Sequence, residues 1–186
     1  DDARLLELSR AIEVGVRVDA PGVLLTDYHT VVSGVLAASG RLKRNAATKE
    51  PETLVSWRDY VADAAFLIAI RGPEGVIARC AEAVRRPAWP PYLGRRSCPP
   101  GRPLYEGVGQ YESVAEALAA WPRLAGAGAA PEGGVTAEVP VGYGGGLRRS
   151  DELLSRQRRT FAVRSVRRVL VHPPERPEED PCTSPG

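Results

Sequence analysis

A short apolar run followed at once by an amphipathic helix is the feature that most constrains the fold of this chain. Residues 64–70 read Ala-Ala-Phe-Leu-Ile-Ala-Ile, and so short a continuous apolar run predicts a central, buried strand. Pro73 suits the first turn of a helix. The apolar positions of that helix share one face, at Val76, Ile77, Cys80 and Val84. Strand, turn and helix in this order make half of a ferredoxin-like pattern.

Apolar alternation predicts a second strand at residues 12–19, with its buried face at Ile12, Val14, Val16 and Val18. Ala20-Pro21-Gly22 predicts a turn, so residues 23–28 are expected to return as the second strand of a hairpin. Further strands are predicted at residues 104–110, 135–139 and 161–166. Ser113 and Glu116 form a capping box, which predicts that a helix starts there.

The segment from Ala83 to Tyr105 contains no acidic residue and carries five arginines. Its prolines fix φ and keep the residues before them out of the α region, which predicts a rigid, extended loop. At its centre lie Gly94, Arg95, Arg96 and Ser97. Two adjacent guanidiniums and a hydroxyl beside a glycine suit phosphate binding, because arginine presents planar paired donors. The alternative is an exposed loop with solvated arginines.

A second stretch without acids runs from Tyr28 to Lys49 and contains three closely spaced basic residues, Arg41, Lys43 and Arg44. Its Ser, Gly and Asn residues favour a long excursion over about residues 29–57. Long excursions within a compact domain are functional or disordered. Composition alone leaves both possibilities open.

Composition excludes several other classes of protein. The 186 residues carry a net charge of only +2, and the three cysteines show neither disulfide nor zinc spacing. We therefore expect no metal and no cofactor. Neither a signal peptide nor an apolar run of membrane-spanning length is present, which predicts a cytoplasmic location and no membrane partner.

Catalysis of RNA cleavage without a metal needs a positioned acid and base, most often histidine. The chain has two histidines, His29 and His172, and neither has an evident partner base in the sequence. We therefore predict no catalytic residue. A metal-free endoribonuclease that uses His29 with a tyrosine or lysine remains the alternative, and a purely architectural protein is a third hypothesis.

The motif PYLGRRSCP at residues 91–99 resembles the signature of the CasD family of type I-E CRISPR Cascade subunits, in the RAMP superfamily. DYHTV at residues 27–31 and ETLVSWRDYVADAAF at residues 52–66 match the family in the same order. RTFAVRSV at residues 159–166 also fits. The resemblance extends from Asp1 to about residue 171.

This resemblance implies an α/β (α+β) fold of the RAMP type. A ferredoxin-like or RRM-like core would carry an inserted thumb at about residues 29–57 and a basic C-terminal β region. The RNA-binding domain would span residues 1–171, and residues 172–186 are expected to form a disordered tail. Family members begin with a strand and a helix before the Asp-Asp pair, so we expect this methionine-free chain to be N-terminally incomplete.

The resemblance also implies a function in defence against foreign DNA. The family caps the 5′ handle of CRISPR RNA without cleaving it, since cleavage is assigned to CasE. The resemblance implies contacts with the backbone subunit CasC, with the large subunit CasA and with target DNA near the handle end. Gly94, Arg95, Arg96 and Ser97 are then expected to hold the handle backbone. Three further groups of residues are expected to contact RNA: base-stacking residues (Tyr28, His29, Trp57), thumb residues (Arg41, Lys43, Arg44) and other cations (Arg58, Arg159, Arg164). For Trp57, a position in the core is the alternative.

Overall fold

The computed structural model describes residues 2–31, 35–141, 145–155 and 157–177. The chain divides into two compact units. One unit combines residues 1–21 with residues 65–186, and the other consists of residues 22–64. Among the described helices, none is long and apolar enough to cross a membrane.

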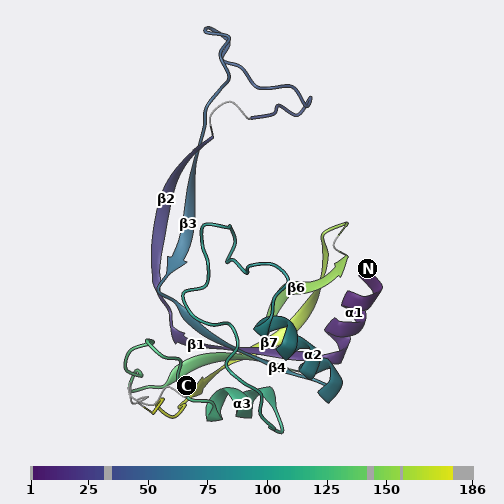
Figure 1. The fold of residues 1–186 in the computed structure, drawn as a ribbon, viewed down its shortest axis with the longest axis vertical. Helices are drawn as coiled ribbons and strands as arrows, with labels where there is room; N and C mark the ends of the chain where they lie inside the picture. The colour runs from purple at the N-terminus through teal and green to yellow at the C-terminus, as the bar shows by residue number, and fades with distance from the viewer. Residues whose placement is uncertain (1, 32–34, 142–144, 156, 178–186) are drawn as a thin grey trace. The chain divides into compact units, whose positions relative to one another are not determined.

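The first unit is built on a five-stranded sheet in the order β4-β1-β5-β7-β6 (Figure 1). Its strands are β1 (Glu13–Ala20), β4 (Ala65–Arg71), β5 (Val135–Pro140), β6 (Leu147–Ser155) and β7 (Thr160–Val171). Every neighbouring pair is antiparallel. With α1 (Asp2–Ala11), α2 (Glu74–Arg85) and α3 (Val114–Ala120), the fold is mixed α+β, as expected.

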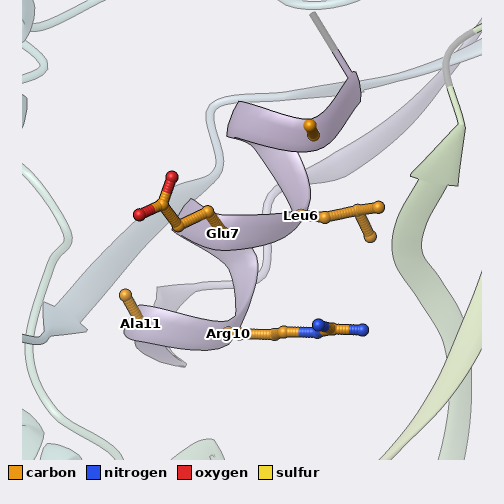
Figure 2. A pocket seen from close by; sticks show the side chains of 5 residues that line it. Leu6, Glu7, Arg10 and Ala11 are labelled. Carbon is orange, nitrogen blue, oxygen red and sulfur yellow. The ribbon is translucent and has the colours of Figure 1, made fainter.

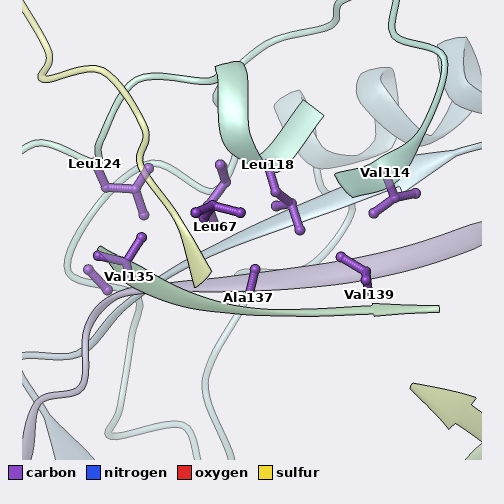
Figure 3. Packing of buried hydrophobic residues seen from close by; sticks show 9 residues of the cluster. Leu67, Val114, Leu118, Leu124, Val135, Ala137 and Val139 are labelled. Carbon is purple, nitrogen blue, oxygen red and sulfur yellow. The ribbon is translucent and has the colours of Figure 1, made fainter. Parts of the chain in front are cut away.

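The core lies between α3 and one face of this sheet (Figure 3). Leu118 of α3 and Ala137 of β5 are fully buried there. Gly15 of β1 permits the close approach, because a Cβ at that position would lie 2.4 Å from Val114 Cγ1. The predicted capping box begins α3: Ser113 Oγ accepts a hydrogen bond from the Glu116 N–H at 3.1 Å.

The prediction that residues 64–70 form a central, buried strand is wrong. Among the described strands, β4 lies at the edge of its sheet and pairs with β1 alone. One of its faces packs against α3 through Ala65 and Leu67. On the other face, Phe66, Ile68 and Ile70 are between 43% and 59% exposed. The helix that follows is present as α2, but none of its residues is buried.

Three other sequence predictions about strands fail. β1 does not form a hairpin with β2 (Val23–Val31), because β1 lies between β4 and β5 while β2 pairs with β3 (Leu54–Ala62). Residues 104–110 form no strand, since neither edge of the sheet pairs with them. On β1 the most buried side chains are Arg17 and Asp19, whereas the alternating valines are half-buried.

The second unit is a β-hairpin with an extended tip. β2 and β3 pair in continuous register from Val23↔Ala62 to Val31↔Leu54. Residues 35–53 then form a locally hydrogen-bonded loop, with isolated bridges at Leu36↔Leu42 and Arg44↔Pro51. The predicted excursion at residues 29–57 therefore begins within β2 and ends within β3, so paired strands occupy both of its ends.

Hydrogen bonds also extend beyond the domain limit expected at residue 171. The Pro174 carbonyl accepts a hydrogen bond from the Arg123 N–H at 3.0 Å, and Arg176 donates to Glu106 Oε2 at 2.5 Å. Residues 174 and 176 of the expected tail therefore contact other parts of the first unit, and the disorder of the tail stays a prediction. Residues 178–186 lie outside the described residues.

Replacing Ile68 with lysine is expected to reduce self-association of the isolated protein. Ile68 is 59% exposed on the edge strand β4, and an apolar edge with unpaired backbone groups favours pairing with a second chain. Size-exclusion chromatography with light scattering measures the effect. Val84→Lys, at an exposed apolar position on α2, is the control. A wild-type protein that stays monomeric over the concentration series would contradict the prediction.

Candidate nucleic-acid interface

The arginine-rich loop lies in the connection between α2 and α3, where residues 86–113 form neither helix nor strand (Figure 1). At its centre the chain folds back on itself. The Leu93 N–H donates to the Cys98 carbonyl at 2.8 Å, and the Cys98 N–H donates to the Arg95 carbonyl at 2.9 Å. Gly94 has φ +84°, a left-handed conformation that disfavours other residues, and no atom lies within 4 Å of where a Cβ would be. The signature motif is thus a tight turn with an open face.

The two adjacent arginines of this turn have different surroundings. Arg96 and Ser97 are exposed to solvent. Arg95 is half-buried and interacts with other parts of the chain. Arg96 therefore presents a guanidinium to an incoming phosphate, whereas Arg95 also has a structural part.

Arg85 and Tyr105 hold the two ends of the loop together. Arg85 Nη2 donates to the Tyr105 hydroxyl at 2.7 Å, and the guanidinium carbon lies 4.2 Å from the centre of the tyrosine ring. A cation–π contact and a hydrogen bond between the same two residues limit how far the loop ends can separate. This contact supports the rigidity that the prolines predict.

In the hairpin, the pairing divides the predicted residues between two faces. Tyr28 and Trp57 are direct cross-strand partners, and their rings form an edge-to-face pair with centroids 4.9 Å apart. They are 54% and 70% exposed, so Trp57 is not a core residue. His29 pairs with Ser56 in the next register position, which places His29 and Arg58 on the opposite face because side chains alternate along a strand.

The three predicted basic residues at the hairpin tip are exposed, and the side chains of two of them are engaged locally. Lys43 forms an ion pair with Glu52 at 3.1 Å, and Arg44 Nη1 donates to the Lys49 carbonyl at 2.9 Å. Arg41 closes a small turn through its carbonyl, which accepts from the Ala37 N–H. Exposed ion pairs of this kind cost little to exchange for a phosphate contact.

The two predicted cations of the β6–β7 region also differ. Arg159 is exposed at the connection between the strands and has φ +50°. Arg164 forms a two-pronged pair with Asp151, at 2.7 Å and 2.8 Å. The hydrogen bond from Arg164 lowers the pKa of Asp151 and raises the pKa of Arg164, despite an opposing effect of partial burial. Arg164 is therefore already neutralised by a carboxylate.

Residues 1–167 match the family described as "CRISPR-associated protein (Cas_Cas5)". The chain belongs to this family. It is 35% identical over 129 residues to "CRISPR system Cascade subunit CasD" of Escherichia coli (strain K12), a match that covers 63% of this chain. The matched region spans 54% of that relative, a little over half of its length. The resemblance inferred from the PYLGRRSCP motif is thereby confirmed.

A solved structure supports the same family assignment. A chain of a "CRISPR RNA-guided surveillance complex" superposes with a TM-score of 0.63 and 28% sequence identity, over 91% of this chain and 78% of that chain. The fold of this Cas_Cas5 family member is therefore similar to that of a protein within such a complex.

The predicted site residues belong to no metal-ligand cluster in the part of the chain that the structure describes. Within the described ranges, no group of three His, Cys, Asp or Glu residues could hold a metal ion. A hollow of about 520 Å³ lies against α1 (Figure 2). It is lined by Ala3, Leu6, Glu7, Arg10 and Ala11, with Leu6 and Arg10 pointing to the same side of the helix. None of the predicted site residues lines it.

A buried charge cluster was missed because it looks like ordinary strand alternation in the sequence. Arg17 and Asp19 form an ion pair of 2.5 Å with both side chains fully buried. Arg17 also donates to three carbonyls at and beyond the end of α3, those of Leu118, Trp121 and Pro122. The sequence does contain an indication of this pair, because an arginine and an aspartate two residues apart in a strand lie on the same face.

Proposed function

We propose that this chain is a non-catalytic RNA-binding subunit of a CRISPR RNA-guided surveillance complex and that it binds the 5′ handle of the CRISPR RNA. The observation that carries this proposal is the turn at residues 93–98. Arg96 and Ser97 are exposed there, in a loop without acidic residues that is held by prolines and the Arg85–Tyr105 contact. Phosphate suits this turn because guanidinium groups donate paired, charge-assisted hydrogen bonds.

The hairpin supports the same function independently. Tyr28 and Trp57 offer exposed ring surface, and single-stranded RNA is bound through stacking of unpaired bases on aromatic side chains. The exposed cations at the tip suit the RNA backbone or an acidic surface of a neighbouring subunit. We propose that its protein partners are the backbone subunit CasC and the large subunit CasA, and that it contacts target DNA near the handle end. The proposed location of the complex is the cytoplasm. Membership of the Cas_Cas5 family and the similarity to a Cascade subunit and to a chain of a surveillance complex support a place in such a complex.

Binding of labelled handle RNA at a series of salt concentrations tests the proposal. Each phosphate that the protein neutralises releases counterions, so log K should fall with log [salt] by roughly 0.7 per contact for a single strand. Affinity that is absent at low salt would favour the purely architectural hypothesis. RNA of the same length and shuffled sequence is the specificity control.

Incubation with CRISPR repeat RNA in the presence of a chelator tests the enzymatic alternative. We expect no cut product, because general acid–base cleavage needs two positioned groups. Cleavage that disappears in His29→Ala would establish the endoribonuclease instead. Nothing in the described structure favours that outcome over RNA binding alone.

Trypsin is expected to cut the free protein within residues 35–53 and to cut it much more slowly once RNA or the neighbouring subunits are bound. Arg41, Lys43 and Arg44 are exposed cleavage sites in a tip that buries no core, so its order depends on what it contacts. Mass spectrometry of timed digests measures the change. Equal cleavage rates in free and assembled protein would contradict this expectation.

A further inference from the structure

Trp89 is the most exposed large apolar side chain among the described residues, with 82% of its surface accessible. Tryptophan offers more apolar surface than other side chains, and leaving it in water forgoes that burial. No motif in the sequence singles it out. An isolated, almost fully exposed tryptophan is therefore a candidate contact for a partner with a flat, apolar face.

The backbone around Trp89 restricts how the ring can move. Pro87 lies two residues before it, and Pro90 and Pro91 follow it directly. The residue before a proline is held in extended conformations, so the Trp89 backbone has little freedom to lose on binding. The Arg85–Tyr105 contact ties together the ends of the loop that contains it. The ring is thus presented in a pre-organised way.

The charge of the loop decides between classes of partner. Residues 83–105 carry five arginines and no acid, so a partner with regularly spaced negative charges fits this loop. Single-stranded RNA combines that charge with flat bases that stack on tryptophan. An apolar protein surface would not use the arginines, whose charges would have to be desolvated against it.

We propose that Trp89 is a base-stacking residue for single-stranded RNA, beside the phosphate-binding turn at residues 93–98. This inference rests on the proposed function and adds a second kind of contact to it. The turn would hold the backbone, and Trp89 would stack on an unpaired base of the same strand. Tyr92, which is 51% exposed in the same loop, is near it in sequence.

The test compares Trp89→Phe, Trp89→Leu and Trp89→Ala in the full chain, using a labelled single-stranded handle RNA. Removing an aromatic ring that stacks on a base lowers RNA affinity by between about fivefold and 150-fold. We expect that loss for the leucine and alanine variants, with most of the affinity retained by the phenylalanine variant. Leu104→Ala, at a 51% exposed position in the same loop, should bind as the wild type does.

Tryptophan fluorescence gives a second readout that a structural role would not change. The chain has three tryptophans, Trp57, Trp89 and Trp121, and stacked bases quench an indole directly. In a Trp57→Phe background, RNA should quench most of the Trp89 signal, and the quenching should vanish in Trp89→Phe although that variant still binds. Unchanged melting temperatures in all variants are expected from the exposure of the ring.

The outcomes separate the two proposals. Wild-type protein that does not bind RNA at low salt would overturn the proposed function and this inference together. RNA binding that is equal in wild type, Trp89→Leu and Trp89→Ala would overturn stacking alone and leave the proposed function standing. Equal losses in Trp89→Leu and Trp89→Phe, without quenching, would also overturn stacking.

Discussion

Replacing Arg95 and Arg96 together with alanine is expected to weaken handle RNA binding about a hundredfold. Charge-assisted contacts to phosphate contribute roughly 1.5–3 kcal/mol each when they are well formed, so losing both costs on the order of 3 kcal/mol or more. The loop is already rigid, and little of that energy is spent on ordering it. Fluorescence anisotropy over a salt series should also show a shallower slope, because fewer counterions are released.

The single variants should differ, because the two side chains have different surroundings. Arg96 is exposed, so Arg96→Ala should lower RNA affinity and leave the melting temperature unchanged. Arg95 is half-buried and has contacts within the chain, so Arg95→Ala should lower both affinity and stability. Measuring the melting temperature beside the affinity separates the two contributions.

Arg167→Ala with Arg168→Ala is the matched control, since it removes the same charge from an adjacent, exposed pair on β7. Arg168 lies 3.8 Å from Glu138, so part of its charge is already balanced. We expect a small effect on RNA affinity from this pair. Equal and small effects from both double variants would mean that the loop at residues 93–98 is structural and that the site assignment is wrong.

Features that depend on neighbouring residues could be predicted from the sequence. The start of α3 follows from Ser113 and Glu116, whose side chains act within one turn of helix. The loop at residues 86–113 follows from its prolines, although its centre folds into the tight turn at residues 93–98 where an extended segment was predicted. Strand positions at residues 12–19, 135–139 and 161–166 also follow from local alternation.

Features that depend on which strands pair could not be predicted. Apolar composition of residues 64–70 does not tell an edge strand from a central one, because that depends on how many partners β4 finds. The Pro21-Gly22 turn suggested a hairpin between β1 and β2, but β1 pairs with distant strands on both sides. Likewise, only the β6–β7 register brings Asp151 to Arg164 and removes that arginine from the set of free cations.

Asp19→Ala is expected to destabilise the protein by about 3–5 kcal/mol, the range for breaking a buried ion pair by removing one partner. The carboxylate of Asp19 accepts from Arg17 Nε at 2.5 Å and Nη2 at 2.9 Å, and from the Leu124 N–H at 2.8 Å. Its loss leaves a fully buried guanidinium without this carboxylate. Urea unfolding followed by circular dichroism measures the change, which is a large share of the roughly 5–15 kcal/mol that stabilises a typical domain.

The control for this variant lies on the same strand. Glu13 of β1 pairs with Arg71 at 3.3 Å, but both side chains are about half exposed, so Glu13→Ala should cost less than about 1 kcal/mol. Arg17→Leu combined with Asp19→Val should recover part of the loss, because well-packed apolar residues often replace a buried pair at little cost. The recovery is expected to be incomplete, since Arg17 also donates to the Trp121 and Pro122 carbonyls beyond α3. If Asp19→Ala and Glu13→Ala lowered stability equally, the buried ion pair would contribute no more to stability than the exposed one.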